Sequence, residues 1–190
     1  MEAIRIIEQE HRSLAAVLHG LLYVVRQIRF AKATPDFGLL EAMLDYIEIF
    51  SERFHHPKED AYLFDRLGAR SPASAALIER LQREHQSGAA KLVALRQALV
   101  RYREGGSSAF SVFAVQVAQF AAFHWDHMRV EEDDLLPLAK VHLTAADWAT
   151  VDAAFLGHTD PLFGAERTEA YQQLFDRIVN LAPSPIGRAR

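Results

Sequence analysis

Apolar residues recur along this chain at alternating steps of three and four, the spacing that places side chains on one face of an α-helix. The first stretch runs from Ile4 to Ile28, and its apolar stripe contains one histidine, His11. Three further stretches run from Leu40 to Phe54, from Leu77 to Tyr102 and from Phe113 to Leu135. The pattern predicts an all-α protein with four long amphipathic helices.

Turn-forming residues separate the four stretches. Thr34-Pro35-Asp36 lies between the first two, Ser71-Pro72 reads as a helix cap followed by proline, and Gly105-Gly106-Ser107 divides the last two. Because the connections are short, sequential helices are expected to run antiparallel, which predicts an up-down-up-down four-helix bundle. A ferritin-like bundle is not expected, since it needs one long crossover connection.

Two additional C-terminal helices are predicted beyond the bundle. Thr144 and Asp147 have the spacing of a helix cap, and a loop over residues 158–164 precedes a last helix from Glu166 to about Leu181. We therefore expect a bundle over residues 1–143, a helical extension over 144–182 packed on it, and a flexible tail over 183–190. Pro57 lies inside the second helix and is expected to kink it.

Composition narrows the class of protein. The chain has 190 residues, of which 50% are apolar, enough for one domain with a substantial core, and no apolar run approaches the roughly 18 residues of a membrane span. The absence of cysteine excludes disulfides and thiolate-bound metals. A net charge of −4 without a basic stripe gives no support for nucleic-acid binding. With an amphipathic N-terminus in place of a signal peptide, we predict a cytoplasmic protein with no nucleic-acid or membrane partner.

Histidines and carboxylates occur in a pattern that is written twice, the second copy about 72 to 74 residues after the first. The pattern comprises Glu10-His11 and His55-x-x-x-Glu59-Asp60, then Glu84-His85 and His127-x-x-x-Glu131-Glu132. A histidine and a carboxylate four residues apart stand on the same helix face, within reach of a shared ion. The repeat therefore suggests ligands that point into the bundle from all four helices.

The four histidines of the repeat are expected at one level of the bundle. His11 lies roughly 20 residues before the first turn and His55 roughly 19 after it. At the second turn, His55 lies about 14 residues before it and His85 about 13 residues after it. At the third turn, His85 lies about 19 residues before it and His127 about 20 residues after it. At about 1.5 Å per residue, the levels agree to within about 3 Å. Burying these imidazoles with two carboxylates and no cation would be costly, so the sequence predicts a metal site.

Nitrogen and carboxylate ligands without sulfur favour iron, manganese or zinc. Six ligands are too many for one tetrahedral zinc, whereas two ions about 3.5–4 Å apart and bridged by Glu59 and Glu131 would use them all. The predicted ligands are His11, His55, Glu59, His85, His127 and Glu131.

Two positions leave alternatives open. His124, one turn before His127, is a candidate seventh ligand or a partner that orients a ligand. His56 and Asp60 share a four-residue spacing one step around the helix from His55 and Glu59, and the repeat favours the latter pair. The carboxylates adjacent to ligands are expected to orient imidazoles or to face solvent; these are Glu10, Asp60, Glu84 and Glu132.

These motifs resemble those of the hemerythrin-like, or HHE cation-binding, domains. The resemblance covers Ile4 to about Pro137 and rests on Glu10-His11, His55 through Asp60, Glu84-His85 and His124 through Glu132. It implies a non-haem centre of two iron ions with an oxo or hydroxo bridge and two bridging carboxylates, able to bind oxygen. By motif position it assigns the same six ligands. The oxygen carriers of the family have a His-x-x-x-His pair in the third helix, where this chain has His85 and Ala89.

Two classes of function follow from a di-iron centre. A binding protein would bind O2 or NO, or hold iron, for sensing or storage, whereas an enzyme would be a ferroxidase or a peroxide-handling oxidoreductase. The additional histidine and the small number of non-bridging carboxylates favour a binding protein over an enzyme. The last two helices are candidates for covering an end of the bundle or for forming a homodimer contact.

Overall fold

The computed structural model describes residues 1–157 together with residues 173, 174 and 176, and within these residues it contains helices and no strands. The predicted all-α class is confirmed. The expected last helix falls almost wholly outside the described residues, as do the loop over 158–164 and the tail over 183–190. In chain order the helices are α1 (Glu2–Phe30), α2 (Phe37–Ile47), η1 (Glu48–His55), α3 (His56–Lys58), η2 (Glu59–Phe64), α4 (Asp65–Arg70), η3 (Pro72–Ser74), α5 (Ala75–Gly105), α6 (Ser107–Val130), η4 (Glu131–Leu135), α7 (Leu136–His142) and α8 (Ala145–Leu156).

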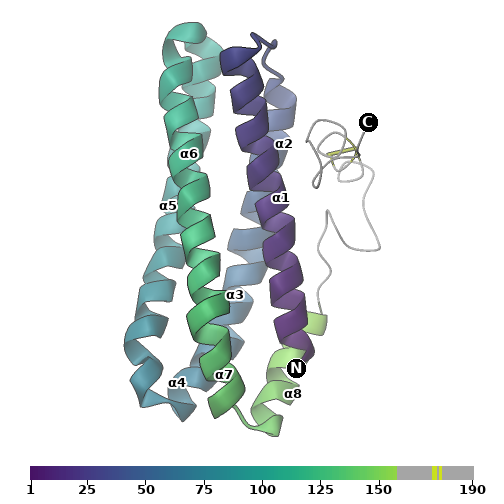
Figure 1. Cartoon of the computed structure of the whole chain (residues 1–190), viewed down its shortest axis with the longest axis vertical. Coiled ribbons are helices and arrows are strands. Elements are labelled where there is room, and N and C mark those ends of the chain that lie inside the picture. Colours follow the sequence, from purple (N-terminus) through teal and green to yellow (C-terminus); the bar gives the residue numbers. More distant parts are fainter. Residues whose placement is uncertain (158–172, 175, 177–190) are drawn as a thin grey trace.

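Four long segments form the bundle: α1, the run from α2 to α4, α5, and the run from α6 to α7 (Figure 1). Each packs against two others, since α1 and α5 both contact α2 and α6. The connection at residues 31–36 and the turn at Gly106 lie at one end of the bundle, and the connection near Ser71 lies at the other (Figure 1). Gly106 has a φ of +62°, a left-handed conformation that residues with a side chain rarely adopt.

Two apolar clusters fill the bundle, one on each side of a polar layer. On α1, Ile4 and Ile7 belong to one cluster and the residues from Leu14 onward to the other. On α5, Leu81 and Leu92 are divided in the same way. The residues between the clusters on these helices include buried histidines, so the core itself sets the level of the polar layer. None of the described helices is long and apolar enough to cross a membrane.

Helix α8 covers the end of the bundle where the N-terminus lies (Figure 1). Thr144 caps α8, as the sequence predicts, and Asp147 completes the reciprocal capping hydrogen bonds. The Asp147 carboxylate also accepts two hydrogen bonds from Arg70, at 2.8 and 3.1 Å. Asp152 accepts a hydrogen bond of 2.8 Å from the Ala3 backbone N–H. Polar contacts of Asp147 and Asp152 therefore hold α8 against α4 and α1.

The helix irregularity expected at Pro57 extends over eight residues before the short α3 and six residues after it. The π-helical segments η1 and η2 flank the short α3, which contains Pro57. Proline has no N–H for the helical hydrogen-bond ladder, and a π-helical turn shifts the following residues around the helix axis. As a result His55 and His56 are both buried, although neighbours in an α-helix point about 100° apart.

Candidate metal centre

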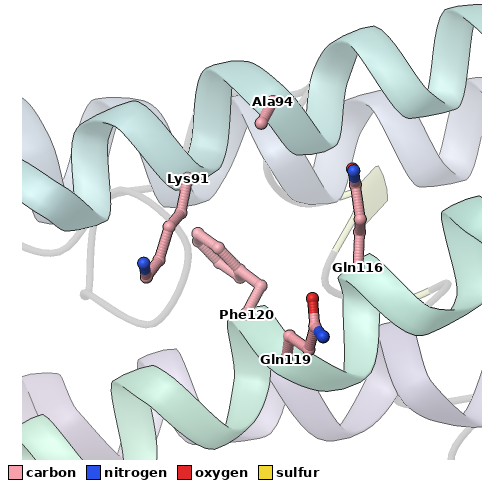
Figure 2. Close-up of a pocket in the computed structure, with 5 residues that line it drawn as sticks. All are labelled: Lys91, Ala94, Gln116, Gln119 and Phe120. Carbon is pink, nitrogen blue, oxygen red and sulfur yellow. The ribbon is translucent and has the colours of Figure 1, made fainter.

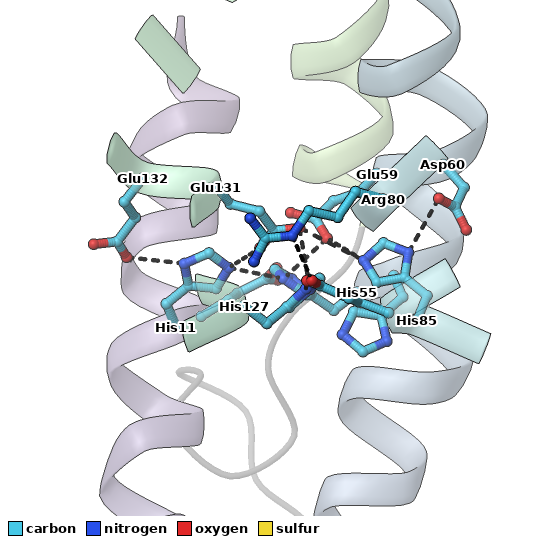
Figure 3. Close-up of polar contacts among 12 residues, drawn as sticks. His11, His55, Glu59, Asp60, Arg80, His85, His127, Glu131 and Glu132 are labelled. Atoms are coloured by element: carbon cyan, nitrogen blue, oxygen red, sulfur yellow. Dashed lines mark hydrogen bonds and ion pairs between the residues drawn. The ribbon is translucent and has the colours of Figure 1, made fainter. Parts of the chain in front are cut away.

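Seven buried side chains meet in the polar layer between the two apolar clusters, and all of them except His56 are labelled in Figure 3. They form two groups, and within each group one potential ligand atom per residue lies within 4.8 Å of the others. One group has three imidazoles and the other has two imidazoles and two carboxylates. The members are His56, His85 and His127 in the first group, and His11, His55, Glu59 and Glu131 in the second.

The Glu131 carboxylate lies between the two groups. Its Oε2 is 3.3 Å from His11 Nε2, whereas its Oε1 is 3.2 Å from His127 Nε2 and 3.5 Å from His85 Nε2. One oxygen thus faces an imidazole of the second group and the other faces imidazoles of the first. This is the placement expected of a carboxylate that bridges two metal ions.

Glu59 is placed in a similar way on the other side of the layer. Its Oε2 is 3.4 Å from His55 Nε2 and 3.6 Å from His85 Nε2, so this carboxylate also contacts imidazoles of both groups. All six residues that the sequence repeat singled out as ligands therefore lie together in the folded chain.

Four carboxylates outside the layer each hold one imidazole from a neighbouring helix. The Nδ1–H groups donate to carboxylate oxygens in the pairs His11–Glu132 at 2.8 Å, His55–Glu10 at 2.7 Å, His85–Asp60 at 3.0 Å and His127–Glu84 at 2.9 Å. A histidine that donates from Nδ1 presents the Nε2 lone pair to a metal, in a fixed orientation and with increased basicity. The motif carboxylates thus make the contacts expected of imidazole-orienting residues.

Two basic side chains extend this outer set of contacts. Lys58 Nζ donates to Glu10 Oε1 at 3.4 Å and lies 4.6 Å from the centre of the Phe155 ring in α8. Arg80 Nε donates to Glu84 Oε1 at 2.7 Å. The Lys58 contact links the carboxylate behind His55 to the helix that covers the bundle end.

The charges of the layer are unbalanced in a way that suits a cation. Burial and the nearby Glu131 carboxylate raise the pKa of Glu59 well above its usual value. Burial lowers the pKa of His11, but the neighbouring Glu131, Glu132 and Glu59 carboxylates together outweigh it and raise the pKa to about 10. Among the described residues, both oxygens of Glu59 and of Glu131 have no hydrogen-bond partner. Buried carboxylates in this condition require either protons or metal ions, and the surrounding imidazoles fit metal ions.

His56 lies in the polar layer together with His55. The repeat favours His55 as the ligand and leaves His56 as the alternative, whereas in the structure both are buried, and His56 stacks on His85 with ring centres 4.1 Å apart. Both side chains turn inward because η1 and η2 shift the residues around the helix axis. The one signal in the sequence was Pro57 immediately after the His-His pair, which shows that the helix is irregular but not by how much.

His124 lies beside the layer but outside both groups of potential ligands. Its ring is fully buried and packs edge-on against Phe120, with ring centres 4.4 Å apart. Neither ring nitrogen has a hydrogen-bond partner among the described residues. Burial lowers the pKa of His124 to about 3, so the ring is neutral at physiological pH. Its role as a ligand stays a prediction.

An all-helical bundle with this layer of imidazoles and carboxylates defines a class of metal-binding helical bundles. The model of the hemerythrin HHE cation-binding domain matches residues 2–139, and the chain therefore belongs to this family. A search of curated proteins finds no match. The family match ends within α7, so α8 lies outside the matched residues.

Proposed function

We propose that this protein binds two iron ions in the polar layer and that the resulting centre binds O2 or NO. The observation that carries this proposal is that Glu59 and Glu131 each contact imidazoles of both groups. Shared carboxylates of this kind hold two ions at short distance, whereas one ion would leave half of the layer uncompensated.

The two ions would have different sets of ligands. His56, His85 and His127 would hold one ion, His11 and His55 would hold the other, and both carboxylates would reach both ions. Bound iron supplies redox chemistry and a coordination position for a small molecule. The chain itself fixes the imidazoles through the outer carboxylates and excludes water through the two apolar clusters.

Metal analysis tests the proposal directly. Protein purified after growth with added iron should contain about two iron ions per chain, because the ligands form two adjoining groups. Manganese and zinc are the alternative metals for these ligands. Reduced protein should then show new absorption bands after exposure to O2 or NO. One zinc ion per chain, unchanged by iron supply, would contradict the di-iron centre.

We also infer the finer organisation of the chain. The positions of the connections at alternating ends support an up-down-up-down order of the four long segments. The contacts of α8 with α1 and α4 support a bundle over residues 1–143 on which the first part of the predicted extension packs. The rest of that extension, to residue 182, lies almost wholly outside the described residues. A cytoplasmic location and a homodimer stay predictions from the sequence.

A di-iron oxidoreductase, either a ferroxidase or a peroxide-handling enzyme, is the second candidate function. The observation that favours it is His124, a buried neutral imidazole beside the centre whose nitrogens have no partner among the described residues. Such a group can hold a reacting molecule or transfer a proton at one of its nitrogens. Multiple turnovers of hydrogen peroxide or ferrous ion by the iron-loaded protein would support the enzyme, and a single binding event would support the binding protein.

A further inference from the structure

A largely buried lysine stands at the end of a chain of polar contacts that leads into the polar layer. Lys58 Nζ donates to Glu10 Oε1 at 3.4 Å, and Glu10 Oε2 accepts from His55 Nδ1 at 2.7 Å. Glu10 and His55 are both buried. The positive charge of Lys58 is therefore separated from a candidate ligand by a single carboxylate.

Helix α8 covers this lysine. The Lys58 side chain is 12% exposed, and its Nζ lies 4.6 Å from the centre of the Phe155 ring, which is fully buried in α8. An aromatic face attracts a cation electrostatically, and it does so most strongly where the cation has lost its hydration. Glu10 and Phe155 thus hold the ammonium group in a place with little solvent around it.

The second copy of the repeat differs at the equivalent position, where Val130, a buried apolar residue, stands in place of Lys58. The carboxylate of Glu84 instead accepts from Arg80, a residue of its own helix, at 2.7 Å. The Arg80 side chain is 44% exposed. Water around an exposed side chain screens its charge, so Arg80 acts on the layer more weakly than Lys58 does.

A charge at the position of Lys58 acts on the oxidation state of a nearby iron ion in two ways. Reduction of a ferric ion adds one electron to the site, and a positive charge favours this more strongly in a buried place than in water. A carboxylate that accepts from the Nδ1–H of a ligand makes the imidazole more basic, which favours the ferric ion. Because Lys58 shares the Glu10 carboxylate, it weakens that second influence. Both effects of the lysine therefore raise the reduction potential.

We propose, building on the proposed di-iron function, that Lys58 under α8 raises the reduction potential of the ion that His11 and His55 hold. Lys58 acts through Glu10 and is a positioning residue, not a ligand. The ion on the other side of the layer is next to the exposed Arg80 and lacks this influence. Since α8 lies outside the residues that the family model matches, this control of potential belongs to the helix that follows the matched bundle.

A second lysine provides a comparison on the other side of the layer. Lys91 Nζ lies 5.0 Å from the centre of the Phe123 ring, and Phe123 stacks on His127 with ring centres 6.3 Å apart. Lys91 is exposed, however, and lines a surface cavity of about 270 Å³ between α5 and α6 (Figure 2). Solvent screens a charge in this position, so Lys91 should have little effect on the potential of either ion.

Lys58→Met is the direct test, because methionine has a flexible apolar side chain without a charge. The iron-loaded protein is reduced stepwise with dithionite, and the two one-electron potentials are followed by absorption and EPR spectroscopy. We expect the reduction equilibrium of one ion to fall about tenfold, which corresponds to about 59 mV, and that of the other ion to change less. Phe155→Leu should shift the same potential in the same direction by a smaller amount, since water can then reach Lys58.

Three variants separate the charge of Lys58 from its packing. Lys58→Arg keeps the charge and should keep the potentials close to wild type. Arg80→Met and Lys91→Met each remove an exposed charge and should change the reduction equilibria about twofold or less. Unchanged potentials in Lys58→Met or in Phe155→Leu would overturn the proposal. Equal shifts in Lys58→Met and Lys58→Arg, or in Lys58→Met and Arg80→Met, would overturn it as well.

A measurement without iron distinguishes this proposal from the di-iron function. In the metal-free protein, the NMR signal of the His55 Nδ1–H proton should move downfield in Lys58→Met, because Glu10 then accepts a stronger hydrogen bond from His55. His55→Gln identifies the signal by its loss. An unmoved signal would overturn the proposal. Wild-type protein that binds no iron but shows the shift would contradict the di-iron function and leave the influence of Lys58 on His55 supported.

Discussion

The two copies of the sequence repeat make the same set of carboxylate–imidazole hydrogen bonds in the folded chain, and this set is called the outer frame. In each copy the glutamate before the first histidine holds the second histidine, as Glu10 holds His55 at 2.7 Å and Glu84 holds His127 at 2.9 Å. The acidic residue after each bridging glutamate holds the first histidine of the other copy, in the pairs Asp60–His85 at 3.0 Å and Glu132–His11 at 2.8 Å. These contacts form a closed ring around the four long segments.

The two copies differ at positions just inside this frame. Met128 occupies the position equivalent to His56, which accounts for three imidazoles in one group and two in the other. At two further positions the first copy has Leu14 and Glu52, where the second copy has Gly88 and His124. The residues that hold the imidazoles are therefore acidic in both copies, whereas the positions closer to the centre differ and give the two groups of potential ligands different compositions.

The largest effect is expected from a residue that both halves share. Glu59→Ala should remove nearly all bound iron, because the carboxylate contacts imidazoles of both groups. Alanine has no oxygen atoms that could take over these contacts. Metal analysis of the purified protein measures this loss. Asp65→Ala is the control, since the Asp65 side chain is 65% exposed. Full iron content in Glu59→Ala would refute the bridging role.

A substitution that makes the first copy resemble the second should have the next largest effect. His56→Met should lower iron content from about two ions per chain to about one, because it removes an imidazole from the group of three only. His19→Ala, whose ring lies against Trp125 outside both groups, should keep both ions. If His56→Met also kept both ions, His56 would not be a ligand and the two groups would not differ in their number of imidazole ligands.

Removing the outer carboxylates should weaken metal binding without abolishing it. Glu10→Gln and Glu84→Gln should each lower iron affinity, measured by competition with a chelator, by about 10- to 100-fold. The larger loss is expected for Glu10, because its side chain is 4% exposed and that of Glu84 is 18% exposed. If the two variants lost iron affinity equally, burial of the carboxylate would not decide the size of the effect. If neither lost affinity, the outer carboxylates would not strengthen metal binding by the imidazoles.

The smallest effect is expected at α8, which follows the repeat and takes no part in its frame. The hydrogen bond from Arg70 holds the pKa of the Asp147 carboxyl well below its usual value. A lowered folded-state pKa means that the contact stabilises the fold above the unfolded value, about 3.9. This stabilisation is lost as pH falls below that value toward the folded pKa. Asp147→Asn should therefore lower the melting temperature of the metal-free protein at pH 7, and the difference from wild type should shrink near pH 3. A constant difference would contradict this account.

Much of the centre was predictable from the sequence because helices have a regular rise. The spacing of His11, His55, His85 and His127 from the turns placed them at one level, and the structure brings them together with Glu59 and Glu131. The apolar pattern likewise predicted the all-α class, and the motifs predicted the family. These features depend on local periodicity and on chain length between turns, both of which can be read directly from a sequence.

Other features were decided by the tertiary structure. His56 points inward because η1 and η2 change the phase of the helix, and such π-helical turns depend on packing that no local pattern reveals. His124 lies beside Gly88 and Glu52, which come from two other segments of the bundle, and no local pattern brings these three residues together. The sequence by itself determined which residues lie at the level of the centre. Only the folded chain decided which way they face and what they touch, because rotation about a helix axis and contacts between helices are set by the whole core.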